Sequence, residues 1–333
     1  MLGGRGRWSW PGPTCGAVHP DDSRHRYLYG SALVTEREHP RSEERSGTLL
    51  GIATYSLWGL FPIYFHALEP TSAIEILAHR ILWSLVAVAA VLMLKRDWRW
   101  TRGLLRSRRQ LLQVTAAAIL IAINWLVYVW AVEQDRVIEA SLGYFINPLV
   151  TVALGVVVLG EHLSRLQRFA VALGALSVIV VTVAYGAIPY VSLTLAFSFA
   201  GYGFIKKTVH LGPLHSLTAE TAILTPFSLV VLAWMGLHGS LEFGKSPGLT
   251  VLLLSAGVVT AFPLLLFAAA ARRIPLNLLG LLQYLTPAMQ FMLAILVFKE
   301  HMDTSRWIGF GIVWMALIVL SVDAIHRMRS ARL

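Results

Sequence analysis

Ten long apolar stretches follow one another over residues 48–325, and short polar connections separate them. A helix needs about 20 predominantly apolar residues to cross the hydrocarbon core of a bilayer, and each stretch has roughly this length. The stretches are continuously apolar rather than alternating, which indicates helices and not the strands of a membrane barrel. The predicted spans are 48–67, 73–94, 111–132, 138–159, 166–185, 188–205, 214–236, 249–270, 275–298 and 305–325.

The composition excludes a soluble fold. Hydrophobic residues make up 56% of the chain and charged residues 14%, whereas soluble domains average about 45–50% and 25%. A soluble protein this apolar could not cover its surface with polar groups. The sequence therefore predicts an all-α integral membrane protein with ten transmembrane helices.

The net charge of +10 first suggests nucleic acid, but the positions of the basic residues indicate membrane topology instead. If the N-terminus is cytoplasmic, the cytoplasmic connections and the C-terminal tail hold sixteen Lys and Arg residues, and the outer connections hold four. The four are Arg136, Lys245, Lys299 and Arg306. We therefore expect both termini in the cytoplasm, contact with the lipid bilayer and no binding of nucleic acid.

Residues 1–47 differ from the rest of the chain. They are rich in Arg, Gly, Pro, His and acidic residues and contain no apolar run long enough for a signal peptide. This composition is typical of a disordered tail, which the predicted topology places in the cytoplasm. The next methionine is Met93, so only a non-AUG start, for example near Val34, would give a shorter product that keeps the first apolar stretch. N-terminal sequencing that finds residue 1 would exclude such a start.

One pattern occurs twice, half the chain apart. Pro148 and Pro287 are separated by 139 residues (287 minus 148), and so are the pairs Glu161-His162 and Glu300-His301. A duplication of the first half of the chain would produce this constant separation.

The duplication predicts how the ten spans are organised. Ten spans divide into five plus five, and an odd number per half turns the second copy upside down relative to the first. Inverted repeats are a hallmark of transporters that expose one central site alternately to the two sides of a membrane. We therefore expect two inverted five-helix repeats, 48–185 and 188–325, and a cytoplasmic tail at 326–333.

Polar side chains recur at corresponding positions of the fourth and ninth spans. Their spacing of three and seven residues places them on one helical face of each span. Polar side chains at bilayer depth avoid lipid, so we expect the two faces to meet across a central cavity and to bind a solute. The alternative is interhelical hydrogen bonding that only holds the bundle together. The residues are Tyr144, Asn147 and Thr151 on the fourth span and Gln283, Thr286 and Gln290 on the ninth.

Pro148 and Pro287 lie within these two spans. Each frees the carbonyl four residues earlier, so each is expected to bend its helix. A pair of bent helices can shape a cavity, although single prolines are common in membrane helices.

Four segments together resemble a known family. They are GIATYSLWGLFPIYF (51–65), AHRILWSL (78–85), NWLVYVWAV (124–132) and SLGYFINPLVTVALGVVVLGEHLSRLQ (141–167). They resemble RarD-type proteins, which belong to the EamA branch of the drug/metabolite transporter superfamily. The resemblance covers residues 45–325, and this chain departs from it in its long N-terminal tail. It implies ten helices in two inverted EamA domains and a permease of the bacterial inner membrane that needs no bound cofactor.

Two charged residues lie well inside predicted spans, more than a turn from either end. Arg80 is in the second span, beside His79, and Glu220 is in the seventh, the counterpart of the second. An arginine at mid-membrane costs about 2.5–3.5 kcal/mol on insertion scales, so such residues are usually functional. We expect Arg80 and His79 to bind an anionic group of a solute, and Glu220 to carry a coupling proton or to bind a cationic group. The alternatives are an ion pair of Arg80 with Glu220 or Glu75, and snorkelling from a shorter span.

Aromatic residues cluster in the first three spans, among them Trp58, Trp125 and Tyr128. A cavity with aromatic walls and a few polar groups suits amphipathic organic molecules, and we expect Trp58 and Tyr128 to line it. Asn124 lies one turn before Tyr128, and an amide at this depth needs a partner. The alternative for any one of these rings is an anchor at the membrane interface.

The sequence gives no support for a metal, cofactor or nucleotide site. The single cysteine, Cys15, excludes an internal disulfide and a thiolate cluster. The predicted topology puts Glu161-His162 and Glu300-His301 on opposite sides of the membrane, so they cannot share an ion and are expected to end their helices. The sequence contains no Gly-x-x-x-x-Gly-Lys-Ser/Thr loop for ATP.

Small residues on the fifth and tenth spans allow helices to approach closely. They are Ala170, Gly174, Gly309 and Gly311. Packing within the chain or a homodimer contact would use them equally well.

These features favour a secondary-active permease or exporter, not an enzyme. It would move small organic solutes, metabolites or drugs, by alternating access, driven by a proton gradient or by exchange.

The alternatives are an intramembrane lipid-modifying enzyme and a non-transporting membrane sensor. An enzyme would need clustered acids, bases or metal ligands, and the sequence has no His-Glu-x-x-His motif. A sensor would use the basic loop 95–109, which topology and anionic lipids explain as well. The cargo, its direction, the coupling ion and the oligomeric state stay open at this point.

Overall fold

The computed structural model describes residues 39–159, 163–274 and 276–330. The chain divides into two compact units, Met1–Glu43 and Glu44–Leu333. Only the residues that open α1 belong to the described part of the first unit. All contacts reported below lie within the second unit.

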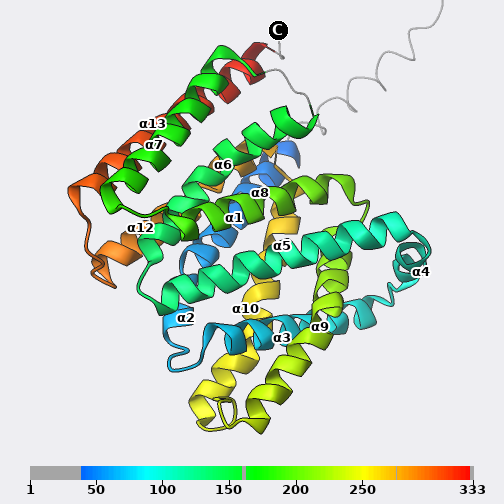
Figure 1. Cartoon of the computed structure of the whole chain (residues 1–333). Helices are drawn as coiled ribbons and strands as arrows, with labels where there is room; N and C mark the ends of the chain where they lie inside the picture. Colours follow the sequence, from blue (N-terminus) through cyan, green and yellow to red (C-terminus); the bar gives the residue numbers. More distant parts are fainter. Residues whose placement is uncertain (1–38, 160–162, 275, 331–333) are drawn as a thin grey trace, which may run out of the picture. The chain divides into compact units, whose positions relative to one another are not determined.

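The described residues form thirteen helices and no strand (Figure 1). In chain order the helices are α1 (His39–Gly59), α2 (Phe61–His66), α3 (Ala73–Lys95), α4 (Arg99–Arg106), α5 (Arg108–Glu133), α6 (Val137–Leu159), α7 (Arg165–Tyr185), α8 (Tyr190–Thr208), α9 (Pro213–Leu237), α10 (Pro247–Ala271), α11 (Leu276–Leu282), α12 (Leu285–Leu296) and α13 (Thr304–Ser330).

Nine helical segments of the described chain are long and apolar enough to cross a membrane. They coincide with nine of the ten predicted spans, so the prediction of an all-helical membrane fold is confirmed. The remaining predicted span, 188–205, is also a helix, α8, but it carries Lys206 and Lys207 in its last turn and is not among the nine segments that are long and apolar enough to cross a membrane. The count of ten spans therefore stays a prediction.

The first and ninth predicted spans are each interrupted. α1 gives way to α2 at Leu60, and α11 gives way to α12 at Gln283 and Tyr284. A proline follows each interruption, Pro62 in the first turn of α2 and Pro287 in the first turn of α12. Proline has no N–H to donate, so it fits the first turn of a helix better than the interior.

Pro148 behaves differently from Pro287. It lies inside α6, which continues to Leu159 without an interruption. The sequence analysis expected both prolines to bend their helices. In the structure Pro287 lies beside an interruption between two helices, whereas Pro148 lies within one continuous helix.

α4 is a short amphipathic helix that the sequence analysis did not predict. It lies in the basic connection between α3 and α5 and begins at Arg99. Its Leu104 is buried beside Val114 and Val209, while Arg102 and Arg106 are exposed. The connection is therefore folded back onto α5, the second of the two helices that it joins.

The helices pack in a few dominant pairs (Figure 1). α3 packs against α9 and α10, α5 against α8, α6 against α8 and α12, and α7 against α13. A Cβ added at Gly257 of α10 would lie 2.2 Å from the backbone carbonyl of Trp83 on α3. Only glycine therefore allows α10 and α3 to approach this closely.

The small residues of the fifth and tenth predicted spans also contact neighbouring helices of the same chain. A Cβ at Gly174 would lie 2.6 Å from Leu149, and one at Gly309 would lie 2.4 Å from Val181. Ala170 is fully buried. Packing within the chain accounts for these three positions, and a homodimer stays a prediction.

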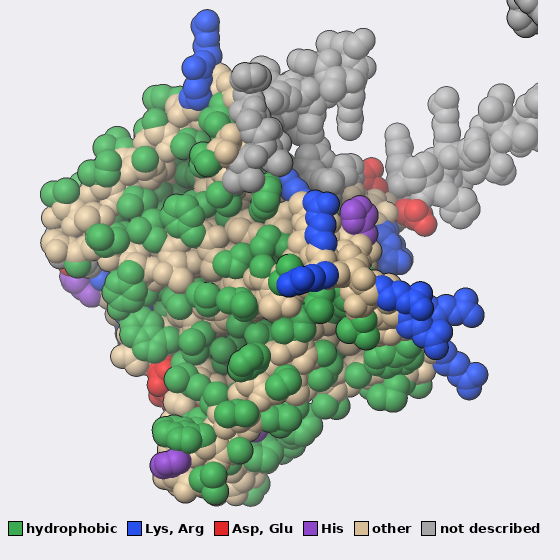
Figure 2. Space-filling model, turned by 45° about the vertical axis from the view of Figure 1, so that its right-hand side comes forward, with side chains coloured by type: hydrophobic (Ala, Val, Ile, Leu, Met, Phe, Trp, Pro, Cys, Tyr) green, Lys and Arg blue, Asp and Glu red, His purple; other side chains and the backbone are tan. Residues whose placement is uncertain are grey.

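Large apolar side chains lie on the outside of the helices. On α9, Phe227 is 70% exposed and Val230 is 69% exposed. Figure 2 shows hydrophobic side chains spread over much of one face, with Lys and Arg gathered toward one edge. Such a surface is unfavourable in water and favourable against lipid, so it fits a protein that is embedded in a bilayer.

Candidate functional site

Arg80 is the buried cation around which the candidate site is built. It lies near the middle of α3 and is only 4% exposed. Its Nε donates a hydrogen bond of 2.9 Å to Oγ1 of Thr260 on α10, and its Nη1 is buried without a partner among the described residues. No ion pair joins Arg80 to a carboxylate in the described part of the chain.

Aromatic rings surround the guanidinium group. Its central carbon lies 4.2 Å from the ring centre of Trp125 on α5. It also lies 5.4 Å from the ring of Phe65 and 5.5 Å from that of Phe61, both on α2. Aromatic faces attract cations within about 6 Å, so these three rings partly replace the water that Arg80 loses on burial.

Tyr128 links the neighbourhood of Arg80 to α12. Its ring lies 5.9 Å from that of Phe65, and its hydroxyl accepts a hydrogen bond of 2.9 Å from Nε2 of Gln290. Gln290 Nε2 also donates to the backbone carbonyl of Trp58, at 3.2 Å. Oε1 of Gln290 is buried without a partner in the described structure, so one strong acceptor is left over at this point.

Asn124 and Tyr144 form a second polar contact on the other side of Tyr128. The Tyr144 hydroxyl donates to Oδ1 of Asn124 at 3.1 Å, and the amide Nδ2 of Asn124 donates to Ser198 on α8 at 3.0 Å. The rings of Tyr128 and Tyr144 are 5.7 Å apart. The amide of Asn124 thus has the partners that its depth requires.

The two polar faces predicted on the fourth and ninth spans come together only in part. Tyr144 on α6 and Gln290 on α12 both contact Tyr128, so a residue of α5 links these two polar side chains. Thr286 instead donates to the carbonyl of Tyr55 on α1, at 2.8 Å. Gln283 lies at the interruption between α11 and α12.

Asn147 and Thr151 bond to each other along α6. The Thr151 hydroxyl donates to the side-chain oxygen of Asn147 at 3.2 Å. Nδ2 of Asn147 is buried without a partner among the described residues. Thr151 is exposed, so this part of the predicted face turns toward the outside of the bundle.

Trp58 packs among aromatic rings. Its ring lies 5.5 Å from Tyr55 and 5.8 Å from Phe267. The backbone carbonyl of Trp58, rather than its indole, contacts the polar network through Gln290.

Glu220 lies on α9 and is paired with a lysine. Its Oε1 accepts from Lys206 Nζ at 2.8 Å and from Ser216 at 2.7 Å, and its Oε2 accepts from Tyr202 at 3.1 Å. Glu220 therefore forms its ion pair with Lys206 and not with Arg80, so the alternative of an Arg80–Glu220 ion pair is wrong.

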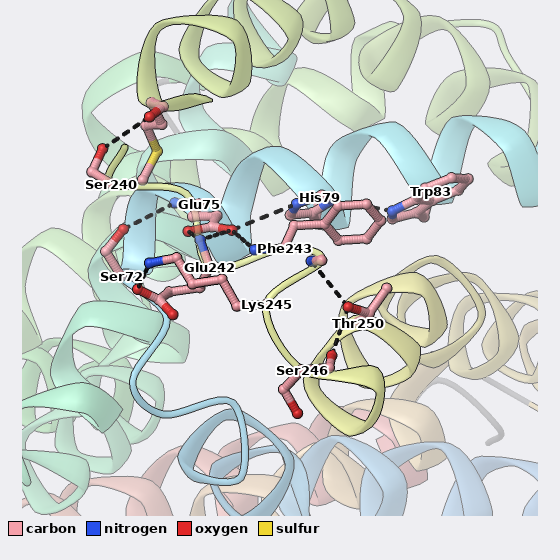
Figure 3. A network of polar contacts seen from close by, with 12 residues as sticks. Ser72, Glu75, His79, Trp83, Ser240, Glu242, Phe243, Lys245, Ser246 and Thr250 are labelled. Atoms are coloured by element: carbon pink, nitrogen blue, oxygen red, sulfur yellow. Dashed lines mark hydrogen bonds and ion pairs between the residues drawn. The ribbon is translucent and has the colours of Figure 1, made fainter. Parts of the chain in front are cut away.

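Glu75 also has partners other than Arg80. Its carboxylate is fully buried and accepts the backbone N–H groups of Glu242 and Phe243, at 3.0 and 2.9 Å, from the loop that joins α9 to α10. His79 stacks on Phe243 with ring centres 4.6 Å apart, and its Nδ1 accepts from Trp83 (Figure 3). These side chains fasten the start of α3 to the α9–α10 loop, and we call this contact the Glu75 clasp.

A corresponding contact fastens the start of α9 to the connection after α3. His215 Nε2 lies 2.8 Å from Asp97 Oδ2, and the His215 ring stacks on Trp100 at 5.1 Å. Glu75 and His215 are each the third residue of their helix, counted from Ala73 and Pro213. The two contacts thus occupy matching positions in α3 and α9, and we call the second one the His215 clasp.

Glu300 caps the start of α6. Its carboxylate accepts from the backbone N–H groups of Val137 and Ile138, at 2.6 and 2.9 Å. Burial raises the pKa of Glu300 from 4.5 to about 7, the two N–H donors oppose this shift, and the nearby carboxylates of Asp135 and Glu139 reinforce it. The Glu161-His162 pair lies outside the described residues.

Sequence reasoning missed several residues that hold the site together. Thr260 is 180 positions from Arg80, and nothing in the local sequence indicates their contact. Lys206 was counted only among the sixteen Lys and Arg residues of the cytoplasmic connections and the C-terminal tail. Arg136 was also counted only as a loop charge, although it forms a two-bond ion pair with Glu139 at 2.9 and 2.7 Å and contacts Tyr190.

A family model described as the EamA-like transporter family matches two ranges of the chain, 45–183 and 188–322. The chain is 48% identical over 292 residues to Protein RarD of Streptomyces exfoliatus, covering 87% of this chain and 93% of that protein. It is 42% identical over 294 residues to the Uncharacterized transporter YojE of Bacillus subtilis (strain 168), covering 87% and 98%. It is 37% identical over 288 residues to Protein RarD of Escherichia coli (strain K12), covering 86% and 97%.

A solved crystal structure shares the fold at a TM-score of 0.55 and 15% sequence identity, covering 85% of this chain and 98% of the other. At that identity the likeness concerns the course of the backbone alone. The helical arrangement described above is thus one that occurs in another protein.

Proposed function

The chain belongs to the EamA-like transporter family, and we propose that it moves small organic solutes across the bacterial plasma membrane as a secondary-active, alternating-access transporter. The observation that carries the proposal is the cluster around Arg80, in which a buried cation, aromatic rings and unpartnered polar atoms come together. A charge at bilayer depth without a structural counter-charge indicates function. Aromatic walls with a few polar groups suit an organic solute.

The proposed solute-binding residues belong to both repeats. They are Trp58, His79, Arg80, Asn124, Tyr128, Tyr144 and Asn147 in the first repeat, and Glu220, Gln283, Thr286 and Gln290 in the second.

The packing supports two inverted repeats. Helices that the duplication equates pack against each other, α3 against α9 and α7 against α13. Elements beside a two-fold axis contact their own counterparts in this way. The proposed repeats are 48–185 and 188–325, with both termini in the cytoplasm.

The contacts of α8 support a tenth span. Near its start Tyr190 contacts Arg136, which directly precedes α6. At its end Thr208 accepts from Gln113, in the second turn of α5, at 3.0 Å. α5 and α6 are consecutive spanning helices, so they begin on opposite sides of the membrane. Because α8 contacts the start of both, it is long enough to extend from one side to the other.

The two clasps support alternating access. In the proposed topology the Glu75 clasp joins the first repeat to the second at the outer side, and the His215 clasp does so at the inner side. Opening one side while the other stays closed would break one clasp at a time.

We assign energy coupling to a proton gradient or to solute exchange. Glu220 is the proposed proton carrier because its carboxylate is buried on α9, and its ion pair with Lys206 connects α9 to α8.

The experiment that tests this function is solute transport by the purified protein in proteoliposomes that contain a pH dye. A panel of metabolites and drugs is screened for solute-dependent proton flux, with Arg80→Gln and Glu220→Gln beside the wild type and Arg102→Gln, on the exposed side of α4, as the control. We expect flux with a subset of solutes, its loss in Glu220→Gln and no change in Arg102→Gln. Flux that is retained in both site variants would contradict the assigned site, and the absence of flux with every solute, in counterflow as well, would contradict the function.

A further inference from the structure

We propose that the transported solute is an organic anion, with a carboxylate that binds Arg80 and an aromatic or apolar skeleton that carries a hydrogen-bond donor. This inference rests on the proposed function, because it names the solute class of that same site. Four observations carry it: the unbalanced charge, the orientation of the guanidinium group, the rings around it and the unpartnered acceptor of Gln290.

The charge of Arg80 is the first observation. A buried cation normally pairs with a buried anion, but both carboxylates that the sequence analysis named as partners are engaged elsewhere. Glu75 binds backbone N–H groups of the α9–α10 loop, and Glu220 binds Lys206. Counted from Ala73 and Pro213, Arg80 and Glu220 are each the eighth residue of their helix. Glu220 is neutralised by an ion pair with Lys206, whereas Arg80 has no ion-pair partner among the described residues.

The orientation of the guanidinium group is the second observation. Thr260 accepts from Nε and thereby fixes one edge of the planar group. Nη1 remains buried with no acceptor in the described part of the chain. A guanidinium group binds a carboxylate through two parallel N–H···O bonds from two nitrogens, and Nη1 is free to supply one of them.

The single positive charge also selects among anions. A carboxylate brings one negative charge and balances one arginine. A phosphate monoester brings about two, of which the charge of Arg80 balances one. The charge balance therefore favours a carboxylate.

The aromatic rings are the third observation. Trp125, Phe61 and Phe65 present their faces to the guanidinium group. In the state described here they cover the cation. A solute whose carboxylate replaces them at the cation would leave these faces free to stack on its own skeleton, and such stacking favours aromatic or apolar solutes.

Gln290 supplies the fourth observation. Its amide nitrogen is held by Tyr128 and by the Trp58 carbonyl, so its side-chain oxygen is held in place as well. This oxygen is buried and accepts no hydrogen bond from the described residues. A hydroxyl or amino group on the solute would satisfy it, because buried acceptors are rarely left unpaired.

The test measures binding of matched acid and amide pairs to the purified full-length protein by calorimetry and by melting temperature. The probes are benzoate with benzamide and indole-3-acetate with indole-3-acetamide, together with 4-hydroxybenzoate and phenyl phosphate. We expect the carboxylates to bind at least about tenfold more tightly than their amides. We expect 4-hydroxybenzoate to bind more tightly than benzoate, and phenyl phosphate to bind more weakly than the carboxylates.

The variants separate a binding role of Arg80 from a structural one. Arg80→Gln should remove the preference for the acid over the amide, and Arg80→Lys should restore part of it. Thr260→Val should weaken carboxylate binding several-fold while leaving amide binding unchanged, because it releases only the orientation of the guanidinium group. Arg102→Gln, an exposed charge far along the chain on α4, should bind as the wild type does.

Three binding results would overturn the inference: equal binding of acid and amide by the wild type, preferential binding of phenyl phosphate, or an acid preference that survives in a folded Arg80→Gln variant. If the Arg80 variants do not fold, the wild-type pairs and Thr260→Val still decide. Counterflow of the same probes separates this inference from the function: amides that are transported while acids are not would overturn the inference alone. Acids that bind through Arg80 and are never transported would overturn the proposed transport alone.

Discussion

Lys206 and Glu220 form an ion pair in which the two partners differ in exposure. The Glu220 side chain is 2% exposed and the Lys206 side chain is 25% exposed. Removing the lysine therefore leaves a buried carboxylate whose remaining donors, among the described residues, are Ser216 and Tyr202. Removing both charges leaves no such penalty.

Lys206→Met should destabilise the protein by about 1–3 kcal/mol, because a buried acceptor loses its charged donor. The double variant Lys206→Met/Glu220→Gln should recover most of the loss. Melting temperatures in detergent measure both. The control is Lys245→Met, which removes the exposed ion pair between Lys245 and Glu242. This loss should destabilise the protein by less than about 1 kcal/mol. A double variant less stable than Lys206→Met would contradict this account.

The stability of the protein should fall as the pH rises through the range set by Glu300. Burial raises the pKa of this carboxyl from its ordinary value of 4.5 to about 7 in the folded protein. Between these values the folded state binds more protons than the unfolded state, so the free energy of unfolding decreases from about pH 4.5 to about pH 7. The melting temperature between pH 5 and pH 8 measures the effect.

Glu300→Gln provides the comparison for this pH dependence. It keeps a side-chain oxygen for the N–H groups that start α6 but cannot ionise. We expect its melting temperature to fall less with pH than that of the wild type. An equal fall in both proteins would assign the pH dependence to other groups.

At the scale of helices, Gly257 sets the distance between α10 and α3. Gly257→Ala should cost about 1–3 kcal/mol, because the added methyl group would overlap the backbone of Trp83. Gly203→Ala on α8 is the matched control, since nothing lies within 4 Å of its Cβ position. It should be neutral or stabilising by roughly 0.5–1 kcal/mol. Equal melting temperatures of the two variants would show that the close contact is not required.

Locking the Glu75 clasp should stop transport. His79→Cys and Phe243→Cys replace two stacked rings, and a short bis-methanethiosulfonate reagent would join them through two disulfides in a Cys15→Ser background. If the clasp opens during each cycle, cross-linking should abolish solute flux and a reductant should restore it. The two single-cysteine variants, treated alike, are the controls. Full flux in the cross-linked protein would mean that the clasp stays closed throughout the cycle.

The positions of the helices along the chain were predictable because each one depends on the residues of a single continuous segment. Continuous apolar runs fix where a spanning helix lies, and Pro62 and Pro287 could have indicated the interruptions near them. α4 escaped prediction because it is short and half polar. The partners of Arg80 and Glu220 were not predictable, since Thr260 and Lys206 reach them only after the helices have packed.

At the scale of the whole molecule, the two ends of α8 should be reached from opposite sides of the membrane. Ala187 and Lys207 are exposed residues just before α8 and near its end. In intact cells, Ala187→Cys should react with a membrane-impermeant maleimide and Lys207→Cys should not, in a Cys15→Ser background. Labelling after permeabilisation is the control. Equal labelling of both positions in intact cells would contradict a tenth span and the inverted repeats with it.

The central claim is that this chain carries solutes by exposing one site to the two sides in turn, and counterflow measures this most directly. Proteoliposomes are loaded with an unlabelled solute, and the entry of a trace of the same labelled solute is followed without any ion gradient. Alternating access predicts transient accumulation of label above its outside concentration, and its loss in Arg80→Gln. Entry of label that never exceeds equilibrium, or that does not depend on the solute inside, would contradict alternating access through this site.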